Sequence, residues 1–267
     1  MHDSVLSHLR NTLHERLTRH GAHGEHGEHG EHGDVDQARG AGRLFAGDYS
    51  ASTTVAEEFA DSRLGVGVMH DLDGEVISLH GTTWRVPVDG TPREVAPDEG
   101  VAFGVAAHGG REHEFVIPDG ADVEGILAAI DAYLERTHVD HEEVVCAVEI
   151  DGEFSSVVLR TVAPPTHEHE TLGEIIDDET RFTFDHWTGT LVGFRFPDVT
   201  DGQTIPGLHL HAISHDTTTG GHLRNATTVR TTARIWVDEL HPIHDVAGTQ
   251  PDGDSSMDFS RYEGPVT

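Results

Sequence analysis

The pattern of hydrophobic and polar positions predicts a chain built mainly of short β-strands. Short runs of Val, Ile and Leu, separated by Gly, Asp and Pro, are typical of strands and the turns between them. We expect strands at residues 64–69, 75–80, 82–88, 101–107, 144–150, 154–162, 182–185, 190–196, 208–214, 222–228 and 233–237. The Asp151-Gly152 pair predicts a tight hairpin turn between two of these strands.

Helical periodicity is limited to a few segments. Apolar residues recur at helical spacing over residues 122–136, which is the clearest helix, and shorter helices are expected at 55–59 and 171–177. A narrow stripe of Leu predicts a further amphipathic helix at 4–19. Many strands and few helices indicate an α+β fold with antiparallel or mixed sheets.

A low-complexity tract follows the first of these helices. Residues 20–33 repeat Gly, Glu and His, a composition typical of disordered segments. Such a tract is either a flexible linker or a scavenger of zinc or nickel, since His-rich tracts can bind metals. We therefore expect an N-terminal segment at 1–43 and a folded domain at 44–267, with a coil tail at 249–267.

Charge excludes several classes of partner. The formal net charge is −31, and all 17 basic residues are Arg. This charge repels nucleic acid and anionic membrane surfaces, so neither is expected as a partner. Acidic chains without Lys resemble proteins of salt-loving organisms. In the concentrated salt of such cells the electrostatic screening length falls to about 3 Å at 1 M, which weakens repulsion between like charges.

Other sequence features favour a cytoplasmic protein. No apolar run is long enough for a membrane helix, and no signal-peptide core follows Met1. Cys146 is the only cysteine, which fits a reducing compartment and rules out a structural zinc site made of paired thiolates.

Candidate metal ligands lie in two segments, residues 206–214 (PGLHLHAIS) and 220–222 (GGH). Together these segments predict a β-hairpin. Residues 215–221 are rich in Asp, Thr and Gly, which is typical of a loop. Alternate side chains of a strand lie on the same face, so His209 and His211 are expected to point the same way. Without a third ligand, this pair would also fit a polar strand face.

A third histidine joins them if the hairpin closes with Ser214 opposite Gly221. His222 then lies opposite Ile213 and diagonal to His211, on the face that carries the other two histidines. Three imidazoles on one face make an open site typical of catalytic zinc. The same ligands could bind cobalt, nickel or iron.

These motifs resemble the alpha-acetolactate decarboxylase family. The resemblance rests on residues 189–197 (GTLVGFRFP), the two hairpin motifs, and residues 72–75 (LDGE), in matching order and spacing. It covers the chain from about Leu44 to the C-terminus. The resemblance implies two α/β-sandwich-like halves, at about 44–165 and 166–267, with the metal hairpin in a cleft, and a homodimer.

The resemblance also implies roles for individual residues. His209, His211 and His222 take the positions of the family's zinc ligands. Glu75 and Arg160 fall on its first acidic residue and its active-site arginine. Glu263, in residues 261–263 (RYE), falls on its second acidic residue. Among the other candidates, Arg195 is expected to be structural and His215 to lie at the surface.

The implied reaction is zinc-dependent decarboxylation of 2-acetolactate to acetoin and CO2. Departure of CO2 sends electrons into the neighbouring ketone, a divalent cation can stabilise that charge, and an acid must then protonate carbon. Arg suits the substrate carboxylate because the planar guanidinium can donate two parallel hydrogen bonds to the two carboxylate oxygens.

Two alternatives stay open. One is a metal-dependent lyase for a related 2-hydroxy-3-oxo acid, since Val68 stands where the family carries Thr. The other is a non-catalytic, zinc-buffering protein.

Overall fold

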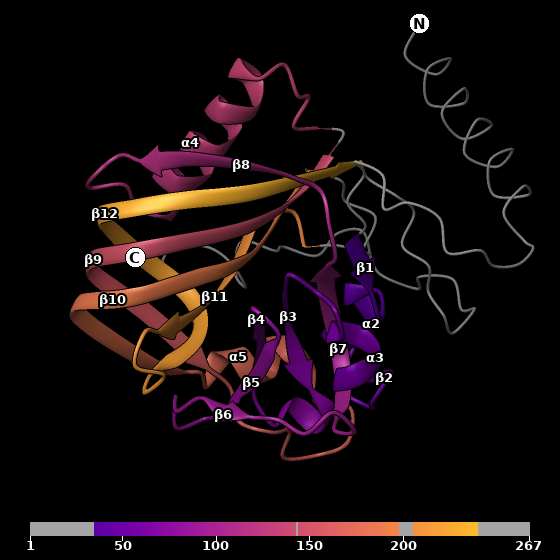
Figure 1. Ribbon diagram of the computed structural model, residues 1–267. Helices are drawn as coiled ribbons and strands as arrows, with labels where there is room; N and C mark the ends of the chain where they lie inside the picture. Colours follow the sequence, from indigo (N-terminus) through magenta and orange to yellow (C-terminus); the bar gives the residue numbers. More distant parts are fainter. Residues whose placement is uncertain (1–34, 143, 198–204, 240–267) are drawn as a thin grey trace, which may run out of the picture. The chain divides into compact units, whose positions relative to one another are not determined.

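The computed structural model describes residues 35–142, 144–197 and 205–239. Antiparallel sheets with few helices make up this part of the chain, which confirms the α+β class (Figure 1). The predicted helix at 4–19, the tract at 20–33 and the tail at 249–267 lie outside the described residues. No helix among the described residues has the length and apolar character needed to cross a lipid bilayer.

The first sheet is built from residues before Arg111. It contains β1 (Val35–Gln37), β2 (Thr53–Thr54), β3 (Leu64–Met69), β4 (Glu75–Leu79), β5 (Thr82–Val86), β6 (Arg93–Glu94) and β7 (Gly100–Ala107). The strand order is β1-β7-β3-β4-β5-β6, and β2 also pairs with β7. Every residue of β3 and β4 is buried, which explains why β3 is a continuous apolar run in the sequence.

The second sheet contains three unusually long strands, with the order β11-β10-β9-β12-β8. Its strands are β8 (Arg111–Ile117), β9 (Val144–Thr161), β10 (Thr180–Phe196), β11 (Gly207–Ser214) and β12 (Gly220–Glu239). Strand β11 also pairs with the start of β12, so β9, β10, β11 and β12 form a closed ring of pairings. In Figure 1 the long strands bend strongly as they approach β11.

Short helices and one longer helix complete the fold. They are α2 (Ala41–Phe45), α3 (Val55–Phe59), the 3-10 turn η1 (His70–Leu72), α4 (Val123–Arg136) and α5 (Leu172–Asp177). Helix α4 is amphipathic, and its buried side chains Ile126, Ile130 and Leu134 share an apolar core with the second sheet. Asp122 accepts a hydrogen bond from Gly125 N–H and so caps its N-terminus.

The predicted hairpin at Asp151-Gly152 is wrong, because β9 runs through this position without a turn. Gly152 has a φ of +148° and pairs with both Gly189 and Thr231. A Cβ here would lie 2.1 Å from the carbonyl oxygen of Arg230. The glycine therefore permits a close approach of β12 and does not form a turn.

Two further predicted breaks between strands are also wrong. The segments predicted at 182–185 and 190–196 belong to one strand, β10, and those at 222–228 and 233–237 belong to β12. Strand β8 was not predicted. The division of the folded domain at about residue 165 remains a prediction; the boundary between the two sheets lies earlier, between Ala107 and Arg111.

Candidate metal centre

The hairpin of β11 and β12 carries the three histidines, with a register two residues from the predicted one. His211 pairs directly with His222, and Ile213 pairs with Gly220, so the predicted pairing of His222 with Ile213 is wrong. The loop is shorter than expected because Ser214 N–H donates to the carbonyl oxygen of Thr219 at 2.9 Å. Side chains alternate with a period of two, so the shift leaves His222 on the predicted face.

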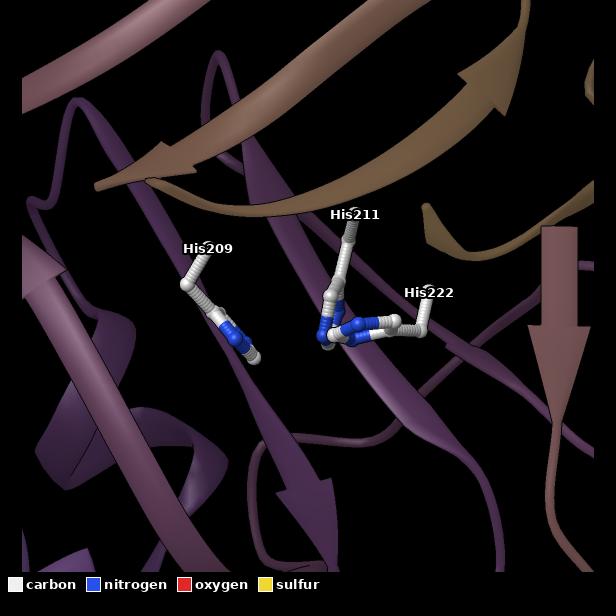
Figure 2. Close-up of side chains that lie close together, drawn as sticks. All are labelled: His209, His211 and His222. Atoms are coloured by element: carbon white, nitrogen blue, oxygen red, sulfur yellow. The ribbon is translucent and has the colours of Figure 1, made fainter. Parts of the chain in front are cut away.

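The three imidazoles converge on one space. One ring nitrogen from each of His209, His211 and His222 lies within 4.8 Å of the others, and all three residues are buried. Their ring centroids are 4.9 to 5.3 Å apart. Figure 2 shows the side chains turned toward one another. This spacing allows all three residues to bind a single ion.

The backbone of the first sheet fixes the orientation of His211. Its Nδ1 lies 2.8 Å from the carbonyl oxygen of Val76 on β4. A carbonyl only accepts hydrogen bonds, so Nδ1 carries the proton and Nε2 keeps its lone pair. Metal-binding histidines are commonly oriented by such a bond from the second ring nitrogen.

Electrostatics keep this ring neutral. Burial lowers the pKa of His211 well below its usual range, and the neighbouring His209, His222 and Arg160 lower it further, against the opposing effect of the Val76 hydrogen bond. A neutral imidazole is the form that binds a metal. The donor set therefore fits a divalent cation that accepts nitrogen ligands.

Glu75 and Arg160 adjoin the histidines. Glu75 is the first residue of β4, directly after the turn at Asp73, and its Oε2 lies 3.6 Å from Nε2 of His211. Its Oε1 accepts a hydrogen bond from Nη1 of Arg160 at 3.4 Å. Arg160 on β9 pairs with His222 on β12, so strand pairing brings the arginine to the metal-facing histidines.

These residues line one pocket. The side with His209, His211, His222, Glu75 and Arg160 is polar. The remaining wall is apolar and consists of Leu44, Phe45, Gly67, Val68, Leu72, Phe103, Val162, Leu172 and Ile205. Such a pocket suits a small ligand that has polar groups at one end.

The structure thus brings together five of the six predicted site residues; Glu263 lies outside the described residues. Val68 lines the same pocket. Arg195 contacts Asp131 of α4 at 3.0 Å and the carbonyl oxygen of His141, which agrees with a structural role. His215 is partly exposed and lies 2.7 Å from Asp151.

Sequence reasoning missed Glu179, which lies next to Arg160. Its side chain is 4% exposed, and its Oε2 lies 3.5 Å from Nε of Arg160. The only signal in the sequence was the alternation of Glu179 and Arg181 at the start of a strand, which resembles an ordinary surface ion pair. The contact depends on pairing of β9 with β10, where Arg181 faces Arg160.

Comparison with known proteins gives a consistent result. The profile of the family described as alpha-acetolactate decarboxylase matches residues 37–250. Alpha-acetolactate decarboxylase of Methylococcus capsulatus is 32% identical over 190 residues, which is 71% of each chain. The Raoultella terrigena protein of that name is 30% identical over 180 residues, covering 67% of this chain and 68% of the relative.

A solved structure has the same fold. The crystal structure of alpha-acetolactate decarboxylase from Bacillus subtilis strain 168 matches with a TM-score of 0.72, over 86% of this chain and 99% of that chain, at 22% identity. The profile match extends over most of the folded domain, which confirms the resemblance drawn from the motifs. The chain belongs to the alpha-acetolactate decarboxylase family of carboxy-lyases.

Proposed function

We propose that this protein decarboxylates 2-acetolactate to acetoin and CO2, with zinc as its metal. The observation that carries the proposal is the convergence of three buried histidines with Glu75 and Arg160 in one pocket. The family relationship supports the same reaction. Imidazole ligands suit zinc, one of several divalent cations that this ligand set accepts.

Each polar residue has a distinct role in this proposal. His209, His211 and His222 hold the cation, which when bound acts as a Lewis acid toward the ketone and hydroxyl oxygens of the substrate. Arg160 binds the carboxylate that leaves as CO2, because its planar donors match carboxylate geometry. Glu75 delivers a proton to the carbon that has lost CO2.

The apolar wall supports this chemistry. Phe45, Val68, Phe103 and Leu172 line the pocket together with the polar residues and reduce its polar surface. Electrostatic interactions are stronger where water is excluded, so Arg160 and Glu75 act more strongly here than at the surface.

The direct test is acetoin formation from racemic 2-acetolactate in molar KCl, detected colorimetrically against a protein-free blank. The purified protein should produce acetoin, lose activity after treatment with a chelator, and regain it when zinc is added. His211→Ala is the matched control and should stay inactive after zinc addition. A wild-type protein that gives no more acetoin than the blank would refute the proposed function.

A deletion variant of this protein distinguishes an enzyme from a zinc-buffering protein. Deletion of residues 20–33 removes most of the tract that a buffer would use. We expect the shortened enzyme to keep one tightly bound ion and full activity. Loss of most of the bound metal on this deletion would favour the buffering function. Glu75 and Arg160 beside the histidines argue against buffering, since metal storage requires neither residue.

Val68 favours one second candidate, a related 2-hydroxy-3-oxo acid as the preferred substrate. An apolar side chain in this wall removes a hydroxyl that could bind the substrate or a water molecule. Comparison of kcat/KM for 2-acetolactate between the wild type and Val68→Thr tests this candidate. A higher value in the variant would support it.

Further features of the proposal follow from the family resemblance. We propose that Glu263 supplies the second acidic group, that the hairpin of β11 and β12 lies in a cleft between two halves, and that the protein is a cytoplasmic homodimer. Light scattering in molar salt tests the dimer, and Glu263→Gln tests the acidic group by its effect on turnover.

A further inference from the structure

Glu179 connects three arginines at the edge of the pocket. Its carboxylate contacts Nε of Arg160 at 3.5 Å, Nε of Arg224 at 3.8 Å and Nε of Arg181. The side chains of Arg160 and Arg224 are 6% and 7% exposed, whereas that of Arg181 is 46% exposed. A carboxylate buried among cations in this way compensates charges that would otherwise be costly to bury.

An alternating row of charges joins Glu179 to the histidines. It runs from Glu179 to Arg160, from Arg160 to Glu75 at 3.4 Å, and from Glu75 to His211 at 3.6 Å. Arg160 therefore contacts two buried carboxylates, of which Glu75 is the one that also contacts His211. Both contacts reach it at defined atoms, Nη1 for Glu75 and Nε for Glu179.

These two contacts limit the orientations that the guanidinium of Arg160 can adopt. The Nη1 contact with Glu75 is a hydrogen bond and the Nε contact with Glu179 is an ionic one at 3.5 Å, so together they restrict how the planar guanidinium turns within the pocket. The remaining N–H groups of the guanidinium can donate to a bound carboxylate. Loss of the Glu179 contact would let the guanidinium turn toward Glu75 and would misplace these donors.

We infer that Glu179 is a positioning residue, which holds Arg160 in the orientation that binds the carboxylate of a substrate. This inference rests on the proposed role of Arg160. It assigns no contact between Glu179 and the substrate itself. The effect of Glu179 should therefore appear only with ligands that carry a carboxylate.

The test measures binding by calorimetry to the full-length, zinc-loaded protein. One probe is 2-hydroxy-2-methylpropanoate, an unreactive molecule with a hydroxyl and a carboxylate; the other is acetoin, which has no carboxylate. Glu179→Ala should weaken binding of the carboxylate roughly ten- to a hundredfold and leave acetoin binding unchanged. Glu179→Gln keeps the size of the side chain and removes its charge, so it should show a comparable loss, because the 3.5 Å contact with Nε of Arg160 is ionic.

Glu149→Gln is the matched control. Glu149 is equally buried at 3% exposure and pairs with Arg234 at 2.7 Å, but it lies on a distant part of β9 and does not line the pocket. It should leave both affinities at the wild-type value. Thermal melting and metal content check that each variant folds; if Glu179→Ala does not, the shorter carboxylate of Glu179→Asp should give an intermediate loss for the carboxylate probe.

Equal affinity of wild type and folded Glu179 variants for the carboxylate would overturn the inference. So would an equal loss for both probes, or no binding of the carboxylate to the wild type. Because the readout is binding, it does not depend on turnover. An inactive wild type that still shows the expected difference would refute the proposed function and keep the role of Glu179.

Discussion

At the residue scale, the three histidines are arranged as a unit, and each should be required. We expect His209→Ala, His211→Ala and His222→Ala to lose bound metal and acetoin formation, because two imidazoles leave too few ligands for tight binding. Elemental analysis after dialysis, together with the acetoin assay, measures both effects. A variant with one retained ion and wild-type turnover would remove that residue from the ligand set.

Substitutions of Arg160 and Glu75 should have different effects from substitutions of the histidines. Arg160→Lys should abolish most activity, because an ammonium cannot replace the planar fork. Glu75→Gln should keep substrate affinity but lower turnover by about 10²–10⁴-fold, the usual contribution of an acid or base. Both variants should retain one zinc ion, since the histidines are intact.

Single-turnover measurements distinguish the roles further. Normal release of CO2 from Glu75→Gln, followed by slow acetoin formation, would place its proton transfer after cleavage of the carbon–carbon bond. Loss of zinc from Glu75→Gln would instead identify Glu75 as a ligand or as a support for His211, which lies 3.6 Å away.

Glu58 gives the first sheet a pH-dependent stability. Burial on α3, followed by the charge of Asp36, raises the pKa of Glu58 to about 8, although a backbone hydrogen bond from Ala38 lowers it. The folded protein therefore keeps this proton up to about pH 8, whereas the unfolded chain releases it near pH 4.5. Stability from this group is complete below pH 4.5 and is lost as pH rises through 8.

Glu58→Gln tests this dependence. The variant should be more stable than wild type at pH 9, by on the order of a few kcal/mol, and should lose much of the decline between pH 5 and 9. Urea unfolding across this range measures the difference, with the exposed Glu124→Gln on α4 as control. The same decline in wild type and Glu58→Gln would contradict the assignment.

At the element scale, close contact between β10 and β11 positions His209. Gly193 on β10 pairs with Leu210, and a Cβ at this position would lie 2.0 Å from the carbonyl oxygen of His209. Gly193→Ala must therefore push the strands apart. We expect a loss of stability of about 1–3 kcal/mol, as for other overpacked interiors, and a weaker metal site.

Thermal melting and zinc competition measure these two effects. Gly40→Ala is the control, because a Cβ at Gly40 has no atom within 4 Å and the residue has a φ of −64°. If Gly193→Ala matched this control in both measurements, the strand contact would not position the metal site.

The same element shows why sequence reasoning succeeded only in part. Buried segments with clear periods, such as β3 and α4, were predicted almost to the residue because local pattern determines them. A break within β9 was predicted from Asp151-Gly152, and β10 was predicted as two separate strands. At these positions, pairing with neighbouring strands overrides local turn preference. The contacts of Glu179 with Arg160 and Arg224 are tertiary, and its alternation with Arg181 in the sequence did not reveal them.

At the scale of the whole molecule, the net charge of −31 should make folding depend on salt. Like charges repel across the compact state, and salt screens that repulsion. We expect the melting temperature to be many degrees higher in molar KCl than at low salt. Equal melting temperatures in both conditions would show that self-repulsion does not limit stability.

The pairing of His222 with both His211 and Arg160 has a consequence for biosynthesis. His211 and His222 belong to one short hairpin, whereas Arg160 lies on β9, which the ribosome produces earlier, before β10 and α5. Strand β12 is the last of the ring to emerge, and β9 lacks this neighbour until then. His222 is therefore the last of these residues to be synthesised, so a nascent chain that lacks β12 does not contain the cluster of three histidines.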